Sequence, residues 1–460
     1  MRILMATAEL RPLVSRGGLG EAVAGLTAAL RRAGHEVDVV LPDYAGWELE
    51  GEWEVPVTVP PWAQPVTARR GTHPDGGELV LVDCPQIRRP DPYVGPGGRD
   101  WPDNDLRFAS FSAAVAALAR SLGADVVQLN DWHTALVPAF LAPTTPTVLT
   151  IHNLAFQGWS NVGWLHELPV HRDAYGRAGA LNMLAGAILV ADAVATVSPT
   201  YAREITTPEG GAGLDDVLRY RGSDLVGIRN GIDTAVWDPA TDPMIPAPYR
   251  AGAMEGKGAA RAELLARTGW ADTREPLVGV VTRLVEQKGI DLVFEAARYL
   301  GGMRARLVVL GSGDRSLADW GRWLAVEHPD RVWFHNAFDL PLAHLIFAGA
   351  DLFAMPSRFE PCGLAQMQAM AYGTIPVVTP VGGLCDTVVD ADGDRAGTGF
   401  VAASVDATGM VDAFHRALAG YRHHQRRRGI VSRGMAVDWS WDAPAAEFAA
   451  LYEKVVAARA

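Results

Sequence analysis

Residues 2–41 read RILMATAELRPLVSRGGLGEAVAGLTAALRRAGHEVDVVL, and they identify the fold class of the chain. An apolar run over Arg2–Ala8 predicts a strand, after which the chain turns at Gly17–Gly20. Apolar residues recur at helical spacing over Glu21–Ala33, which predicts a helix, and Val37–Leu41 predicts the next strand. A strand, a glycine turn, a helix and a second strand in this order are typical of a parallel α/β sheet.

The same alternation continues along the chain in two series. In the first, Val126–Leu129 and Thr147–Ile151 are short apolar runs that predict buried strands. In the second, Leu277–Thr282 predicts a strand, and a helix is expected over Gly289–Leu300. We therefore predict two doubly wound α/β domains, in which ligands bind at the carboxyl ends of the strands.

Chain length supports two domains. The 460 residues exceed the roughly 250–300 residues at which a single hydrophobic core stops growing. The segment 238–249, DPATDPMIPAPY, is too rich in proline to form a helix or a central strand. We place the domain linker there and divide the chain into residues 1–243 and 244–440.

Charge and cysteine content restrict the partners. With 41 Lys and Arg against 53 Asp and Glu, the net charge is −12, which disfavours binding to nucleic acid or to an anionic membrane. No apolar run approaches the roughly 20 residues of a membrane span, and the N-terminus does not resemble a signal peptide. The 3 Cys are far apart, which fits a reducing compartment and no structural zinc. We expect a cytoplasmic protein without a metal, and the sequence leaves its oligomeric state open.

Two motifs that follow predicted strands suggest a phosphate site. Gly17 and Gly18 stand at a strand-to-helix turn, where free N–H groups favour an anion, although a turn without a ligand explains them equally well. Arg283 and Lys288 can converge on one anion from the end of another strand. Two solvated surface cations are the alternative explanation for that pair.

Polar groups at further strand ends suggest a sugar site. Glu360, in the segment PSRFEPCGL, can accept hydrogen bonds from sugar hydroxyls, or can complement a helix dipole. Asp131 and His152 follow two strands of the first series. They are candidates for a sugar-binding wall, although a buried histidine with satisfied hydrogen bonds is the usual alternative.

The motifs together resemble the glycogen and starch synthases of glycosyltransferase family 5, from residue 1 to about residue 455. The matching segments are SRGGLGEA, PDNDLRFASFS, NDWHTALVP, LTIHNLAFQG, VATVSPTYAREI, GIRNGID, VTRLVEQKG, AHLIFAGADLFAMPSRFEPCG, YGTIPVV and VGGLCDTV. The resemblance implies a GT-B fold, in which two Rossmann-like doubly wound domains face each other across a cleft. It also implies that a C-terminal helix, residues 441–460, completes the first domain, which binds the acceptor, while the second domain binds the nucleotide donor.

The resemblance further implies a retaining, metal-independent transfer from a nucleoside-diphosphate sugar to a carbohydrate or aminosugar acceptor, with no separate cofactor. In the resemblance, Arg283 and Lys288 hold the donor diphosphate, Glu360 and the backbone of Cys362, Gly363 and Leu364 hold the sugar, and His152 and Asp131 line the reacting face. Asn230 is expected to contact sugar or phosphate and Phe338 to stack on the base. The glycine pairs Gly17-Gly18 and Gly382-Gly383 complete the expected donor-binding set.

The sequence departs from the family pattern at several polar positions. The family's Lys in the first glycine motif is Ser15, followed by Arg16, which is a candidate replacement cation. The other departures are Gln128 for His, Ala185 for Lys, Ala371 for Arg, Thr379 for Arg and Val381 for Thr. Loss of polar groups around the sugar, with the diphosphate pair retained, suggests the same donor class with a changed sugar or acceptor.

Three hypotheses of function follow. The first is a specialised pseudo-glycosyltransferase that joins a nucleoside-diphosphate valienol-type cyclitol to a nucleoside-diphosphate 4-amino-4,6-dideoxyhexose, as in acarbose-type pathways. The second is an ordinary glycogen synthase that extends α-1,4-glucan from ADP- or UDP-glucose. The third is an inactive nucleotide-sugar-binding protein on the same scaffold.

Overall fold

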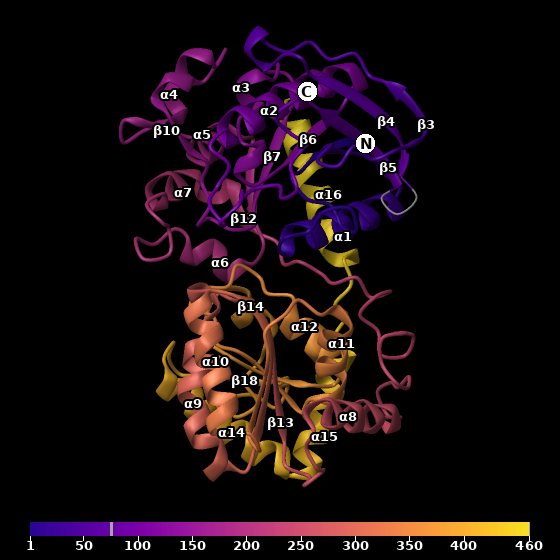
Figure 1. Ribbon diagram of the computed structural model, residues 1–460. Coiled ribbons are helices and arrows are strands. Elements are labelled where there is room, and N and C mark those ends of the chain that lie inside the picture. Colours follow the sequence, from indigo (N-terminus) through magenta and orange to yellow (C-terminus); the bar gives the residue numbers. More distant parts are fainter. Residues whose placement is uncertain (74–76, 460) are drawn as a thin grey trace. The chain divides into compact units, whose positions relative to one another are not determined.

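The computed structural model describes residues 1–73 and 77–459 (Figure 1). The chain forms two compact units. Unit 1 contains Met1–Gly231 and Trp441–Ala460, and unit 2 contains Ile232–Ser440. Each unit is built on its own sheet, and each is described separately below.

Unit 1 has a nine-stranded sheet in the order β12-β11-β7-β6-β1-β2-β5-β4-β3. The strands are β1 (Arg2–Ala6), β2 (Glu36–Pro42), β3 (Glu50–Glu54), β4 (Thr67–His73), β5 (Gly77–Asp83), β6 (Val126–Asn130), β7 (Thr147–Ile151), β11 (Ala193–Thr196) and β12 (Leu225–Gly227). A small sheet joins β8 (Trp159–Ser160), β9 (Gly176–Arg177) and β10 (Ala180–Asn182). The helices are α1 (Gly18–Arg32), α2 (Asn104–Leu122), α3 (Val137–Phe140), α4 (Arg172–Tyr175), α5 (Met183–Val190), α6 (Pro199–Glu204), α7 (Asp215–Arg221) and α16 (Asp442–Ala457).

Strand β1 marks the point where the chain order of this sheet reverses. It pairs in parallel with β2 on one side and with β6 on the other. Parallel pairing continues from β6 to β7 and from β7 to β11. Ligands of doubly wound sheets bind at the carboxyl ends of the strands that flank such a reversal. In unit 1 these are the segments that follow β1 and β6, and the segment after the neighbouring parallel strand β7 lies at the same edge of the sheet.

Unit 2 has a six-stranded, fully parallel sheet in the order β15-β14-β13-β16-β17-β18. Its strands are β13 (Leu277–Leu284), β14 (Arg306–Gly313), β15 (Val332–His335), β16 (Leu352–Met355), β17 (Ile375–Val378) and β18 (Phe400–Val401). Its helices are α8 (Glu255–Thr268), α9 (Ile290–Met303), α10 (Arg315–Glu327), α11 (Leu340–Gly349), α12 (Ala365–Ala371), α13 (Gly382–Thr387), α14 (Ala407–Arg422) and α15 (His424–Ala436). The order reverses between β13 and β16, as in the Rossmann fold.

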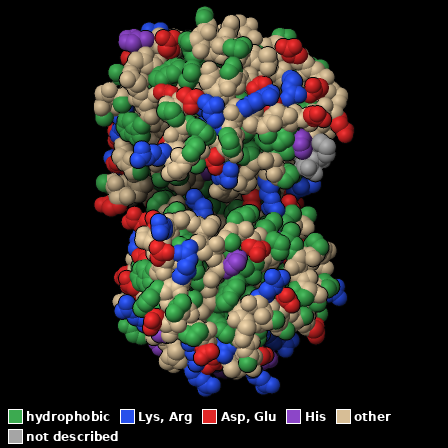
Figure 2. All heavy atoms as spheres, in the orientation of Figure 1, with side chains coloured by type: hydrophobic (Ala, Val, Ile, Leu, Met, Phe, Trp, Pro, Cys, Tyr) green, Lys and Arg blue, Asp and Glu red, His purple; other side chains and the backbone are tan. Residues whose placement is uncertain are grey.

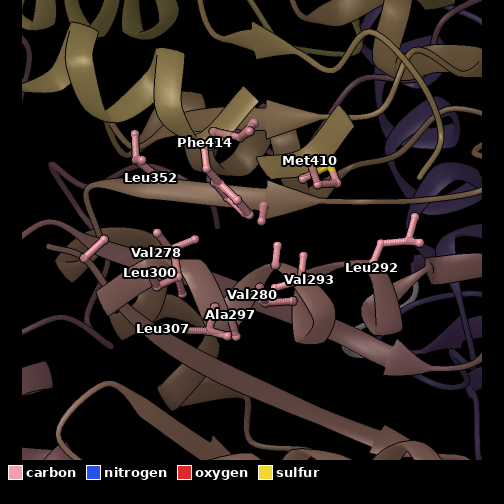
Figure 3. Close-up of a cluster of buried hydrophobic side chains, with 14 of the residues drawn as sticks. Val278, Val280, Leu292, Val293, Ala297, Leu300, Leu307, Leu352, Met410 and Phe414 are labelled. Atoms are coloured by element: carbon pink, nitrogen blue, oxygen red, sulfur yellow. The ribbon is translucent and has the colours of Figure 1, made fainter. Parts of the chain in front are cut away.

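The core of unit 2 lies between its sheet and the helices on one face (Figure 3). Val278 and Val280 stand two residues apart on β13 and therefore point to this same face. Val293 of α9 and Phe414 of α14 are fully buried in the same cluster. Each such side chain contributes about 1.5–3 kcal/mol through burial. The intervening Gly279 faces α11, because a Cβ there would lie 2.7 Å from Cγ2 of Ile346. Helices therefore cover both faces of the sheet, which explains its continuous apolar strands.

The chain passes from unit 1 to unit 2 at residues 231/232, earlier than the boundary at 243/244 that the sequence predicted. The reason is that the proline-rich segment packs on unit 2. Trp237 stacks on His344, with ring centroids 4.1 Å apart, and Asp242 lies 2.8 Å from Nδ1 of that histidine. The segment 238–249 is thus part of unit 2, although it contains no helix or strand.

The C-terminal helix α16 belongs to unit 1, where it packs against α1 and β7 (Figure 1). Tyr452 on α16 donates a hydrogen bond of 2.9 Å to Oε1 of the buried Gln128. Gly25 of α1 packs directly against the indole of Trp441, so that a Cβ at residue 25 would collide with that ring. Residues distant in sequence therefore complete the first domain.

The surface mixes both signs of charge. Figure 2 shows Lys and Arg side chains interspersed with Asp and Glu over the face in view. Within the described residues, no helix is both long and apolar enough to cross a bilayer.

Candidate active site

In unit 1, Asp131 and His152 lie together at the carboxyl ends of the neighbouring strands β6 and β7. Oδ1 of Asp131 accepts hydrogen bonds from the backbone N–H of His152 at 2.7 Å and of Asn153 at 3.3 Å. Asp131 is only 7% exposed, and burial raises the pKa of its carboxyl to about 7. Its φ of 56° is rare for a residue with a side chain, and such strain is concentrated at functional sites.

The imidazole of His152 is held in one orientation by the strand beside it. Its Nε2 lies 2.9 Å from Oδ1 of Asn130, whose Nδ2 donates to the carbonyl of Ala6. The Asn130 oxygen therefore acts as an acceptor, and Nε2 carries the proton. Burial lowers the pKa of His152 to about 3, so the ring is neutral at pH 7 and Nδ1 is an acceptor.

The glycine turn before α1 is fixed by Glu9, a buried carboxylate that the sequence analysis missed. Its Oε2 accepts a hydrogen bond from the backbone N–H of Arg16 at 2.6 Å, and its Oε1 accepts one from the hydroxyl of Tyr93 at 2.7 Å. Gly17 and Gly18 are exposed at the start of α1, and a Cβ at Gly17 would meet nothing within 4 Å. Within the described residues the N–H groups of Gly17 and Gly18 donate to no protein group and are open to a ligand, although Gly17 itself is not required by packing.

Asn230 follows β12 in unit 1, and it is buried, with 7% exposed. In the part of the chain that the structure describes, its side chain makes no hydrogen bond. The carboxamide therefore has donor and acceptor groups that are available to a ligand.

Two of the departures from the family pattern, Gln128 and Thr379, and the candidate replacement cation Arg16 have structural roles in place of ligand contacts. The guanidinium of Arg16 pairs with Asp91 at 3.0 Å, so this cation is already committed to a carboxylate. Gln128 joins the sheet to α16, through Thr150 and Tyr452. Thr379 is fully buried and donates a hydrogen bond of 2.6 Å to the carbonyl of Ser357.

In unit 2, Lys288 and Glu360 meet at the reversal between β13 and β16. Nζ of Lys288, in the 3-10 turn η5 (Glu286–Lys288), lies 2.6 Å from Oε2 of Glu360, and the hydroxyl of Ser357 donates to the same oxygen at 2.8 Å. Glu360 is 4% exposed. Gly289 has a φ of 57° and packs against the carbonyl of Pro356, which brings the two loops together.

Arg283 lies near the carboxyl end of β13 and is exposed. Within residues 1–73 and 77–459, its guanidinium forms no ion pair or hydrogen bond. Phe338 follows β15 and is 88% exposed. A free guanidinium can bind an anion through its planar fork, and an exposed aromatic face is available for stacking.

The two glycine-bearing loops of the predicted donor site are in direct contact. The N–H of Gly383 donates to the carbonyl of Glu360 at 3.0 Å, and a Cβ at residue 383 would collide with the backbone of Cys362. Gly382 begins α13, and Leu364 directly precedes α12. Unit 2 thus brings together the following expected residues: Lys288, Glu360, Cys362, Gly363, Leu364, Gly382 and Gly383.

The described residues contain no group of three or more His, Cys, Asp or Glu side chains arranged to hold a metal ion.

Comparison with known protein families divides the chain in the same way. Residues 2–220 match the starch synthase catalytic domain, and residues 265–431 match the glycosyl transferases group 1 family.

Named relatives match over the whole length. A glycogen synthase of Anaeromyxobacter dehalogenans (strain 2CP-C) is 44% identical over 98% of this chain and 99% of its own. A glycogen synthase of Halorhodospira halophila (strain DSM 244 / SL1) is 43% identical over 100% of both chains.

Solved structures of similar proteins also match this chain over nearly its whole length. The catalytic domain of starch synthase IV from Arabidopsis thaliana, bound to ADP and acarbose, is 32% identical with a TM-score of 0.88 over 99% of both chains. A sucrose-phosphate synthase from Thermosynechococcus elongatus, 20% identical with a TM-score of 0.65 over 99% of both chains, shares the fold. The chain has the two-domain α/β GT-B fold, and it belongs to the starch and glycogen synthase family of glycosyltransferases, family 5.

Proposed function

We propose that this glycosyltransferase is a glycogen synthase, which transfers glucose from ADP-glucose or UDP-glucose to the end of an α-1,4-glucan. The observation that carries the proposal is the pairing of Lys288 with Glu360 where the neighbouring strands β13 and β16 end, the place at which a doubly wound sheet is expected to bind a nucleotide donor. The full-length relatives named glycogen synthase support the same reaction.

The specialised cyclitol transfer, the first hypothesis from the sequence, is not supported. Eight relatives, 40–44% identical over 98–100% of this chain, are all named glycogen synthase. The departures at Gln128 and Thr379 had suggested a changed sugar, yet both side chains are buried and bonded within their own units. The ordinary glycogen synthase reaction, the second hypothesis, is therefore the one that we take forward.

On the donor side, we assign the diphosphate to Arg283 and Lys288. Negative charge develops on the diphosphate as the bond to the sugar breaks, and fixed cations stabilise this charge. Oε1 of Glu360 accepts no hydrogen bond from the described residues and is available to a sugar hydroxyl. Phe338 offers its exposed ring to the nucleotide base. An adenine nucleotide is the first to test, since the Arabidopsis starch synthase structure contains ADP.

For the reaction, we propose a front-face substitution with retention. The bond between the anomeric carbon and the diphosphate oxygen breaks, and the acceptor hydroxyl oxygen bonds to that carbon on the same face. The hydroxyl proton passes to the leaving phosphate oxygen, so no protein base is required. In this scheme, Asp131 and the neutral His152 line the reacting face and bind sugar hydroxyls. We also propose that the transfer needs neither a metal nor a separate cofactor.

The test is incubation of the purified protein with glycogen and either ADP-glucose or UDP-glucose, in buffer containing EDTA. We expect release of nucleoside diphosphate together with lengthening of the glucan chains. Failure of both donors to lengthen glycogen, with folded protein, would overturn the proposal. Activity that EDTA abolishes and Mg²⁺ restores would contradict the metal-independent part alone.

A further inference from the structure

Gln366, on α12, lies beneath the loop that carries Gly363 and Leu364. Its side chain is fully buried, with 0% exposed. Its Nε2 donates to the carbonyl oxygens of Cys362 at 3.1 Å and Gly363 at 3.0 Å, and it lies 3.0 Å from the hydroxyl oxygen of Thr387 on α13. One buried amide thus reaches the donor loop and the helix that carries the second glycine pair.

The surrounding groups fix which end of this amide faces the loop. Two of the three partners of Nε2 are carbonyl oxygens, and the hydroxyl of Thr387 gives its own proton to the carbonyl of Gly383, at 2.6 Å. All three partners therefore present acceptor oxygens, toward which only the NH₂ end can point, and its two protons match the two carbonyls. Oε1, the other end, is buried without a donor among the described groups, and a Cβ at Gly363 would lie 2.5 Å from it.

Fixing the carbonyls of Cys362 and Gly363 also fixes the direction of the N–H groups in the same two peptides. In a planar trans peptide, the C=O and the N–H point in opposite directions. The carbonyl of Cys362 shares a peptide with the N–H of Gly363, and the carbonyl of Gly363 shares one with the N–H of Leu364. Because Gln366 holds both carbonyls, both N–H groups are turned away from it. Over the described residues, neither N–H donates to a protein group.

We propose that Gln366 is a positioning residue for the donor, which aims the N–H groups of Gly363 and Leu364 at the sugar of the bound nucleotide sugar. This inference rests on the proposed function, because it takes the sugar of a nucleoside diphosphate as the ligand of this loop. Thr387 extends the constraint, since its hydroxyl connects Gln366 to the carbonyl of Gly383.

A space-filling role for Gln366 makes a different prediction, and Gln366→Met separates the two. Methionine has a similar length and fills the same volume, but it has no N–H to hold the carbonyls. We expect Gln366→Met to raise the KM for the nucleotide sugar about 10-fold or more and to lower kcat, while the KM for glycogen stays unchanged. A space-filling residue would leave the donor KM at the wild-type value.

Thr374→Val is the matched control. Thr374 is buried in the same unit and donates to the carbonyls of Phe347 and Ala350, but it precedes β17, at the opposite end of the sheet from the donor loop. We expect this variant to lower the melting temperature and leave the donor KM unchanged. If Gln366→Met does not fold, Thr387→Val tests the same constraint, with a smaller rise in donor KM.

The inference is overturned if the variant that folds retains the wild-type donor KM, or if the KM values for donor and glycogen rise together. Such a result leaves the proposed function intact, because the wild-type protein still elongates glycogen in the same assay. Absence of elongation by the wild type would instead count against the proposed function.

Discussion

Nζ of Lys288 lies 2.6 Å from Oε2 of Glu360, and this pair joins the loop after β13 to the loop after β16. The carboxylate is buried and also accepts a hydrogen bond from Ser357. The two charges of this pair compensate each other, whereas the guanidinium of Arg283, near the carboxyl end of β13, is exposed and unpaired within the described residues. The relationship fixes the ammonium where a diphosphate is expected, on strands that doubly wound proteins use for ligands.

Removal of the ammonium tests this relationship. We expect Lys288→Ala to lower kcat/KM for the donor at least about 10²-fold, because it removes charge stabilisation of the leaving diphosphate and leaves Glu360 without its partner. Steady-state kinetics with the nucleotide sugar measure the change. Lys454→Ala is the control, because Lys454 lies on α16 in an exposed pair with Asp224. Equal kcat/KM values for Lys288→Ala and Lys454→Ala would contradict the assignment of Lys288 to the donor site.

The role of Arg283 can be tested separately from that of Lys288. Because its guanidinium is exposed and unpaired within the described residues, Arg283→Ala is expected to leave stability nearly unchanged while raising the donor KM and lowering kcat. Weaker inhibition by ADP, measured in the same assay, would show that the lost contact is to the diphosphate. Arg315→Ala, at a 95% exposed side chain on α10, should match the wild type in every measurement. A matching ADP inhibition constant for Arg283→Ala and the wild type would refute the assignment.

The buried Asp131 predicts a specific dependence of stability on pH. Its folded pKa of about 7 lies above its ordinary value of 3.8, so between these two pH values the folded state binds the proton that the unfolded state has released. The contribution of Asp131 to stability is thus full below pH 3.8 and is lost as pH rises toward 7. Asp131→Asn keeps the shape of the side chain without its charge. The melting temperature of this variant should therefore rise relative to that of the wild type between pH 5 and pH 8.

A melting temperature of Asp131→Asn minus that of the wild type that stays constant or falls over this range would contradict the raised pKa. Both proteins contain His133 and His152, whose contributions to stability change with pH in the opposite direction. Subtracting the wild-type melting temperature from that of Asp131→Asn at each pH cancels these contributions. Burial lowers the pKa of both histidines to about 3, and their contributions to stability are lost as pH falls below about 6.5.

Phe338 is the most exposed large hydrophobic residue of the described chain, at 88%, and its role can be tested without disturbing the fold. We expect Phe338→Ala to raise the donor KM several-fold with no change in melting temperature, because the ring packs on no core. Phe338→Tyr should retain the wild-type donor KM, since stacking needs only an aromatic face. The control is Tyr299→Ala on α9, which is 58% exposed. Equal donor KM values for Phe338→Ala and the wild type would exclude stacking of the nucleotide base on residue 338.

Local sequence patterns predicted the framework of both units because the relevant signals are short-range. The apolar runs at Arg2–Ala8 and Leu277–Thr282 correspond to β1 and β13, and the glycine turn at Gly17 leads into α1. Asp131 and His152 directly follow such runs and Glu360 stands in the loop after one, so all three could be selected because parallel strands end at one edge of a sheet. Their assignment to ligands stays a prediction.

Long-range pairings could not be predicted in the same way. Glu9 and Tyr93 are far apart in sequence, and only the folded sheet brings the carboxylate to the hydroxyl. Gln366 looks like an ordinary helical residue until its amide is seen against the carbonyls of the donor loop. The domain boundary was misplaced because proline content marks where regular structure stops, whereas Trp237 and Asp242 decide which unit the segment packs on.

The most direct test of the central claim is transfer of labelled glucose from ADP-glucose or UDP-glucose to glycogen, followed by digestion of the product with β-amylase. We predict label in the glycogen that β-amylase releases as maltose, because the new residues are α-1,4-linked at the outer chain ends. Lys288→Ala should abolish most of this label, and Lys454→Ala should not. No label in glycogen with either donor, from folded wild-type protein, would contradict the assignment of this chain as a glycogen synthase.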